Sequence, residues 1–287
     1  MQTKILCSAR SQVAPRSIYL RNTQQNNATR WLSSSSGFDK IAVIGLGLMG
    51  HGICQVAAMS GAHSSVIAYE NEQRFLDRGK ERIESSVNKL VSKGKLSESE
   101  ANSALDRITY TTDPNLLSDV DFVCEAVIEN MDLKKDLYRK LSSVCKPDCI
   151  FASNTSSLSI TEMAENSGRP NFFVGVHFFN PVLIMKLVEV IRTKHTNEAV
   201  YENAYKWVSQ IGKVPVSCGD TPGFIVNRLL VPSLIQAMLM VDRNDATIKD
   251  IDISMQLGAG HPMGPIHLAD YIGLDTCYFI IDGWTKK

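Results

Sequence analysis

The segment Lys40–Gly50, KIAVIGLGLMG, constrains the fold of this 287-residue chain more than any other stretch. A short β-branched run ends at Gly45, and a small-residue apolar stretch follows the glycines, so the segment predicts a buried strand, a turn and a helix. Gly45, Gly47 and Gly50 form a GxGxxG pattern at this turn. In this context the pattern indicates a dinucleotide-binding turn, because glycines allow a tight turn, close approach of backbone to pyrophosphate and close packing of helix on strand. An ordinary glycine-rich turn is the alternative.

The residues around this turn indicate which dinucleotide binds. The backbone amides of Leu48 and Met49 lie at the positive end of the predicted helix and are expected to face the phosphates. Glu70 ends a second predicted strand, 66–70, and follows Gly50 by 20 residues. A carboxylate at this position accepts hydrogen bonds from the adenosine ribose and repels the 2′-phosphate of NADP. The sequence therefore predicts NAD as the cofactor; a solvated glutamate at the strand end is the alternative.

Helical patterns alternate with apolar runs over the following residues. A charged stretch that ends at Gly94 and a capping box formed by Ser97 and Glu100 predict a helical hairpin. Further strands are expected at 121–127, 150–153, 174–178 and 187–191, and helices at 131–143 and 198–211. Strands that alternate with helices predict a mostly parallel sheet of the Rossmann type, which we place at 38–219.

The pattern changes after Asp220–Gly223. The stretch 224–240 is apolar at helical period, and no convincing alternating strand follows it. Shorter helices are expected at 250–256, 265–271 and 275–283. The sequence therefore predicts an α/β domain followed by a smaller all-α domain at 220–287.

Composition argues against several classes of function. Thirty Lys and Arg balance thirty Asp and Glu, which gives no whole-chain attraction to nucleic acid. No uncharged apolar run reaches the length of about 18 residues that a membrane span needs. The seven cysteines are scattered without zinc-ligand spacing, which favours a reducing compartment and no structural metal.

The first 37 residues have the composition of a targeting segment. Met1–Gly37 contains no Asp or Glu, carries Lys and Arg along its length and includes the serine run Ser33–Ser36. It lacks the compact apolar core of a secretory signal. We therefore expect a mitochondrial transit peptide at 1–37 and a location in the mitochondrial matrix; a floppy amino-terminal tail is the alternative.

The stretch 174–191, VGVHFFNPVLIMKLVEVI, places polar side chains among apolar ones. His177, Asn180, Lys186 and Glu189 are the polar residues, and buried polar groups need partners. Of the six histidines, only His177 falls within a buried-looking strand. Taken alone, such a histidine is more often a satisfied core residue than a catalytic one.

This stretch resembles the L-3-hydroxyacyl-CoA dehydrogenase family of fatty-acid β-oxidation. The resemblance covers about 40–284 and includes the cofactor turn, SNTSS at 153–157, HFFNP at 177–181, DTPGFIVNR at 220–228 and GAGHPMGP at 258–265. It implies NAD-dependent oxidation of an L-3-hydroxyacyl-CoA to the 3-oxoacyl-CoA. It also implies that the helical domain provides the contact of a homodimer.

By that resemblance, His177 is the catalytic base that removes the proton of the 3-hydroxyl group, and Glu189 is its carboxylate partner. An imidazole titrates near the working pH, and a carboxylate on its other nitrogen fixes its tautomer. Two residues twelve apart cannot touch along one extended strand, so the chain must turn between them. Asn180-Pro181 supplies that turn.

The resemblance assigns further residues to substrate and cofactor. It implies that Ser156 contacts the substrate oxygen and the cofactor, Asn180 the nicotinamide side, and Asn227 the hydroxyl or carbonyl oxygen of the substrate. Caps or turns are the alternatives for these three residues. The resemblance also assigns Glu129 and Lys134 to the cofactor. It assigns Ser86 and Lys93 to the CoA moiety, and we place these two residues on the second helix of the hairpin. A solvated charge pair and a solvated helix face are the alternatives for these two pairs.

The chain departs from the family pattern at two places. The segment 61–65 is longer than usual, and Glu70 stands where Asp is common. The sequence ends at Lys287, whereas relatives continue through a further helical segment that includes one cofactor-contacting lysine. From this we expect weak dimerisation and poor turnover.

Two other interpretations stay open. The cofactor turn also resembles that of the 3-hydroxyisobutyrate and 6-phosphogluconate dehydrogenases, although those enzymes use a lysine in a later glycine-rich helix, and here the motif 177–181 takes that place. A truncated or crystallin-like relative that binds NAD without turnover would share the fold. Formation of NADH from an L-3-hydroxyacyl-CoA separates that relative from an active enzyme.

Overall fold

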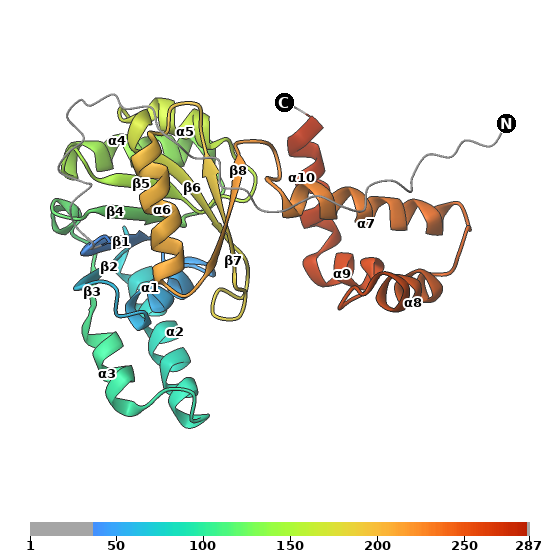
Figure 1. Ribbon diagram of the computed structural model, residues 1–287, viewed down its shortest axis with the longest axis horizontal. Helices are drawn as coiled ribbons and strands as arrows, with labels where there is room; N and C mark the ends of the chain where they lie inside the picture. Colours follow the sequence, from blue (N-terminus) through green and yellow to red (C-terminus); the bar gives the residue numbers. More distant parts are fainter. Residues whose placement is uncertain (1–36, 286–287) are drawn as a thin grey trace, which may run out of the picture. The chain divides into compact units, whose positions relative to one another are not determined.

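The computed structural model describes residues 37–285, so nearly all of the predicted leader, 1–36, lies outside the described residues. An eight-stranded sheet forms the centre of the α/β part (Figure 1). The strands are β1 (Lys40–Ile44), β2 (Ser65–Tyr69), β3 (Ile108–Thr111), β4 (Phe122–Glu125), β5 (Ile150–Ser153), β6 (Phe173–Phe178), β7 (Leu187–Arg192) and β8 (Val214–Gly219). Their order is β3-β2-β1-β4-β5-β6-β7-β8. Strands β1 to β6 are parallel, β7 runs antiparallel to β6, and β8 is parallel to β7, which confirms the predicted mostly parallel sheet.

Helices cover both faces of this sheet (Figure 1). They are α1 (Gly50–Met59), α2 (Gln73–Ser92), α3 (Glu98–Asp106), α4 (Met131–Val144), α5 (Ile160–Asn166) and α6 (Glu198–Gln210), with short 3-10 turns η1 (Pro114–Leu117) and η2 (Pro170–Phe172). Alternate residues of β1 enter different cores, because successive side chains of a strand point to opposite faces. Ile41 and Val43 pack with α1 and α6, and Ala42 and Ile44 pack with α4 and α5.

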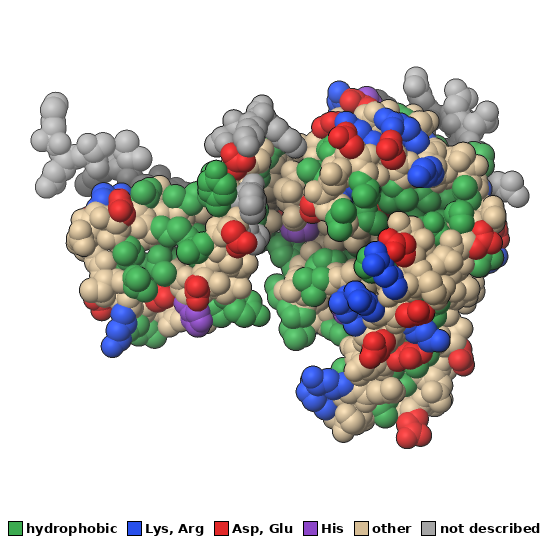
Figure 2. Space-filling model, turned by 180° about the vertical axis from the view of Figure 1, so that it is seen from behind, with side chains coloured by type: hydrophobic (Ala, Val, Ile, Leu, Met, Phe, Trp, Pro, Cys, Tyr) green, Lys and Arg blue, Asp and Glu red, His purple; other side chains and the backbone are tan. Residues whose placement is uncertain are grey.

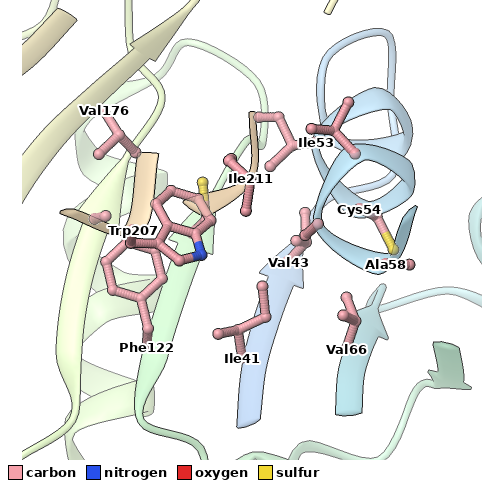
Figure 3. Close-up of a cluster of buried hydrophobic side chains, with 14 of the residues drawn as sticks. Ile41, Val43, Ile53, Cys54, Ala58, Val66, Phe122, Val176, Trp207 and Ile211 are labelled. Atoms are coloured by element: carbon pink, nitrogen blue, oxygen red, sulfur yellow. The ribbon is translucent and has the colours of Figure 1, made fainter. Parts of the chain in front are cut away.

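The core beneath α6 is built around two aromatic side chains. Trp207 of α6 lies against Phe122 of β4, with the ring centroids 4.5 Å apart (Figure 3). The indole nitrogen of Trp207 donates to Nε2 of His63, which is itself buried. Fully burying a side chain such as Phe122 contributes roughly 1.5–3 kcal/mol to folding, so this contact fixes α6 on the sheet.

Helices α2 and α3 lie side by side as the predicted hairpin (Figure 1). The turn between them contains Gly94, whose φ is 64°. Ser97 and Glu100 form the predicted capping box at the start of α3. The placement of Ser86 and Lys93 on the second helix of the hairpin was wrong: Ser86 lies on α2, the first helix, and Lys93 is its C-cap.

After the sheet the chain forms only helices as far as residue 285. They are α7 (Val226–Asp242), α8 (Ile248–Ala259), α9 (Pro265–Ile272) and α10 (Leu274–Thr285). Leu234, Ala269 and Cys277 form a small core of their own. The predicted first helix was to begin at Phe224, but Phe224 has a φ of 50°, which an α-helix does not allow, so α7 begins at Val226.

The sequence missed three elements of the sheet domain: the two edge strands, β3 and β8, and the helix α5. Strand β8 contains Pro215, which argues against a strand in sequence but is tolerated at an edge, where no neighbouring strand needs its amide. Between residues 37 and 285 no helix is long and apolar enough to cross a membrane. The same residues contain no group of His, Cys, Asp or Glu arranged to hold a metal ion.

Candidate active site

Many of the predicted functional residues of the sheet domain gather at the carboxyl ends of its parallel strands. The glycine turn follows β1, Glu70 follows β2, Glu129 follows β4, Ser156 follows β5, and His177 lies near the end of β6. In open α/β sheets, ligands bind outside these strand ends, where the strand order reverses. Here the reversal lies between β1 and β4.

The glycine turn fits a dinucleotide. Gly45 has a φ of 87°, and a Cβ at Gly50 would collide with the carbonyl oxygen of Gly45, so both positions require glycine. At Gly47 a Cβ would meet only open space, which leaves this side of the turn free for a ligand. The carboxylate of Glu70 accepts a hydrogen bond from the amide of Leu46 at 2.6 Å. The acid at the end of β2 therefore lies beside the turn, as an acid that binds ribose must.

His177 and Glu189 meet across the antiparallel pair of β6 and β7. The two residues are register partners, and Nδ1 of His177 lies 2.7 Å from Oε2 of Glu189. Both side chains are buried, and the rings of Phe179 and Phe224 lie 4.5 and 5.5 Å from the imidazole. The chain reverses at Asn180-Pro181, whose peptide bond is cis, so the predicted turn is confirmed.

Glu189 is held as a carboxylate. Its Oε1 accepts hydrogen bonds from the amides of Ile225 and Val226, at 3.0 and 2.9 Å, just before and at the start of α7. Burial acts to raise the pKa of Glu189, but the hydrogen bonds from His177 and from these amides outweigh it, so the pKa is lowered. An ionised partner requires the proton on Nδ1 of His177. Nε2 then keeps its lone pair and can accept a proton.

Glu129 and the SNTSS loop form a second cluster. The Glu129 carboxylate accepts from the amide of Ser156 at 2.9 Å, from its hydroxyl at 3.3 Å and from the hydroxyl of Thr155 at 3.0 Å. Oδ1 of Asn154 accepts from the amide of Phe178 at 2.9 Å. This bond fastens the loop that carries Ser156 to the residue after His177.

A buried ion pair between Lys134 and Glu125 contacts this cluster through Glu129. Lys134 is only 1% exposed, and its Nζ lies 2.5 Å from Glu125 and 3.5 Å from Glu129, so the solvated alternative is wrong for Lys134. Glu125 also accepts from the hydroxyls of Tyr138 and Ser153, at 3.2 and 2.7 Å. Glu125 was not among the residues predicted from the sequence. A carboxylate that ends an otherwise apolar strand, FVCE, was the available signal.

The other predicted residues lie around these clusters or away from them. Asn180 is exposed at the turn after β6, and Asn227 is the second residue of α7, directly after the amides that bind Glu189. Ser86 and Lys93 belong to the hairpin. Among the described residues, no hydrogen bond or ion pair connects them to the His177–Glu189 pair.

The sheet topology, the glycine turn and its neighbouring acid define an NAD-binding oxidoreductase. Comparison with protein families agrees: residues 40–221 match the NAD-binding domain of 3-hydroxyacyl-CoA dehydrogenases, and residues 223–287 match their C-terminal domain. The chain therefore belongs to the 3-hydroxyacyl-CoA dehydrogenase family. By its family it is an NAD-dependent 3-hydroxyacyl-CoA dehydrogenase, which confirms the predicted enzyme class and cofactor.

Individual relatives cover most of the chain. The chain is 48% identical over 243 residues to a probable 3-hydroxybutyryl-CoA dehydrogenase of Deinococcus radiodurans. The aligned residues cover 85% of this chain and 86% of that protein. The chain is 47% identical over 250 residues to the human mitochondrial hydroxyacyl-coenzyme A dehydrogenase, with 85% and 79% covered. The crystal structure of FadB2 from M. tuberculosis matches with a TM-score of 0.83 and 40% identity, over 88% of each chain.

Proposed function

We propose that this dehydrogenase oxidises the 3-hydroxyl group of L-3-hydroxyacyl-CoA thioesters in fatty-acid β-oxidation, with His177 as general base and Glu189 as its partner. The observation that carries the proposal is the 2.7 Å contact between Nδ1 of His177 and a buried carboxylate. That contact leaves Nε2 as the proton acceptor. A neutral imidazole nitrogen with a free lone pair suits removal of a hydroxyl proton.

The chain's own residues divide the work as follows. Nε2 of His177 takes the hydroxyl proton, and Glu189, fixed by two backbone amides, stabilises the imidazolium that forms. NAD, when bound, supplies the acceptor for the hydride from C3. Ser156, in the loop after β5, and Asn227, in the first turn of α7, are proposed to hold the substrate oxygen.

The cofactor and CoA assignments follow the same proposal. The amides of Leu48 and Met49 in the glycine turn would hold the pyrophosphate, since α1 has no capping side chain that occupies its first amides. Glu70 would bind the adenosine ribose. The remaining proposed contacts are Glu129, Lys134, Ser156 and Asn180 for the nicotinamide half, and Ser86 and Lys93 for CoA.

The direct test of this function is an assay of NADH formation by the purified chain. L-3-hydroxyacyl-CoA thioesters of several acyl lengths should reduce NAD, and the D enantiomers should not. NADH formation from neither enantiomer, by a protein that still binds NADH, would contradict the proposal and favour a non-catalytic relative.

We further propose a mitochondrial location and a homodimer. The mammalian relatives carry mitochondrial in their names, and the composition of residues 1–37 is that of a transit peptide. Helices α7 to α10, which we assign to a domain at 220–287, expose apolar side chains that a second copy could cover (Figure 2); these include Leu229, Leu257 and Tyr271. Sedimentation over a series of concentrations should show a dimer, and a chain that stays monomeric at every concentration would contradict this part.

A further inference from the structure

Lys213 is a buried cation for which the residues described by the structure contain no anionic partner. It lies between α6 and β8 and is 7% exposed. Its ammonium donates to the carbonyl oxygens of Val182 and Met185, the latter at 2.9 Å. Burial, assisted by the neighbouring charge of Lys186, lowers the pKa of Lys213. Because buried charges are normally paired, a lysine bound to carbonyl groups alone calls for a functional reason.

The two carbonyl groups belong to the loop that carries Asn180. This loop, 179–186, joins β6 to β7, and inside it the carbonyl of Pro181 accepts from the amides of Ile184 and Met185 at 3.0 and 2.9 Å. Most residues of this loop are exposed to solvent, and Val182 is the buried one. The backbone amide of Lys213 donates to the carbonyl of Val208 at 3.1 Å, so the ammonium extends from an anchored position at the end of α6.

The same loop also packs on the cofactor-binding helix. Val182 is buried, and a Cβ at Gly52 would lie 2.8 Å from its Cβ. Gly52 is the second residue after Gly50 of the glycine turn. The loop is therefore fixed on one side by α1 and through its carbonyl groups by Lys213.

We propose that Lys213 is a positioning residue for the cofactor site: its ammonium holds the carbonyl groups of Val182 and Met185 and thereby fixes the turn that begins at Asn180. Lysine suits this task because an ammonium has three donors and no acceptor. The inference rests on the proposed role of Asn180 at the nicotinamide side. Lys213 itself touches neither cofactor nor substrate in this account.

The test compares Lys213→Met, Lys213→Arg and Asn180→Ala with the wild-type chain. Lys213→Met keeps an unbranched side chain, one atom shorter than that of lysine, but removes every donor. It should weaken NADH binding, measured by fluorescence, about tenfold, since a charge-assisted hydrogen bond is lost. It should also speed hydrogen exchange at the amides of Ile184 and Met185. Lys213→Arg, which keeps donors, should recover part of the affinity.

The double variant decides whether Lys213 acts through Asn180. If it does, Lys213→Met in the Asn180→Ala background should weaken NADH binding by much less than tenfold, because the effects of coupled residues are not additive. Lys206→Met, the same change at an exposed lysine of α6, is the matched control and should match the wild type. Thermal unfolding of the ligand-free variants reports separately on stability.

Several results would overturn the inference. They are unchanged NADH affinity and loop exchange in a folded Lys213→Met variant, full additivity with Asn180→Ala, and an effect that equals that of Lys206→Met. These measurements use NADH binding and exchange, not turnover. A wild-type chain that fails to oxidise L-3-hydroxyacyl-CoA would therefore reject the proposed function without deciding the role of Lys213.

Discussion

At the scale of single residues, Glu189 connects the proposed catalytic histidine to the start of α7. One oxygen binds the imidazole of His177, and the other binds the two amides directly before Asn227. The carboxylate therefore sets the tautomer of the base and also the place where the helical part of the chain begins. The pH dependence of stability should reflect this double role.

The pKa of Glu189 is lower in the folded chain than its ordinary value of about 4.3. A lowered carboxyl pKa contributes stability that is present above the unfolded-state value and is lost as the pH falls through the folded-state value. Glu189→Gln removes this contribution. Its free energy of unfolding should therefore fall less steeply than that of the wild type below about pH 4.3, as measured by urea denaturation from pH 7 to pH 3. If the free energies of unfolding of Glu189→Gln and the wild type fall equally steeply with pH, the lowered pKa of Glu189 is contradicted.

Glu70 controls the choice between NAD and NADP in this account. Its carboxylate lies at the glycine turn, 2.6 Å from the amide of Leu46. Glu70→Ala removes the repulsion of a 2′-phosphate and should lower the preference for NAD over NADP by roughly tenfold or more, measured as a ratio of kcat/KM values. If that ratio stays the same in a stable variant, another residue selects the cofactor.

Residue patterns in the sequence located the pair His177–Glu189. They also identified Glu129 and Ser156, but as separate residues, without predicting that the two bind each other. They did not locate Glu125 or Lys213. A charged residue at a strand end or after Gly212 normally predicts solvent exposure, and only the packed fold shows that these two are buried.

At the scale of elements, the ion pair of Lys134 and Glu125 joins α4 to β4, and the hydroxyl of Ser153 at the end of β5 donates to the same carboxylate. Lys134→Met would leave the Glu125 carboxylate buried without a cation and should lower the free energy of unfolding by about 3–5 kcal/mol. The double change Lys134→Met with Glu125→Gln should recover much of that loss, since no isolated charge remains.

Lys135→Met is the control for this prediction in urea denaturation. Lys135 pairs with the half-exposed Glu162, so its loss should cost no more than about 1 kcal/mol. Equal losses for the two lysines would show that the buried pair has no special weight.

Elements that cross the centre of the sheet were predictable, and the elements at its edges were not. Strands β1, β4, β5 and β6 are continuous apolar runs because both of their faces are covered. Strand β8 is mostly part-exposed or exposed and contains Pro215, and β3 has only four residues. Neither carries the pattern of a buried strand.

At the scale of the whole molecule, the sheet and the helices contribute different parts of the proposed site. The sheet provides the glycine turn and His177, and the start of α7 provides the amides that bind Glu189 and the side chain of Asn227. The switch from alternating strands to helices near Asp220 predicted this division. It could not predict the left-handed backbone of Phe224, which is where the helical pattern began in the sequence.

The central claim is that His177 accepts the hydroxyl proton. The most direct measurement is kcat of His177→Ala with an L-3-hydroxyacyl-CoA, alongside its affinity for NADH. If His177 is the general base, kcat should fall by about 10² to 10⁴, the usual contribution of such a base, and NADH affinity should stay within about twofold of the wild type. Wild-type turnover in this variant would contradict the claim.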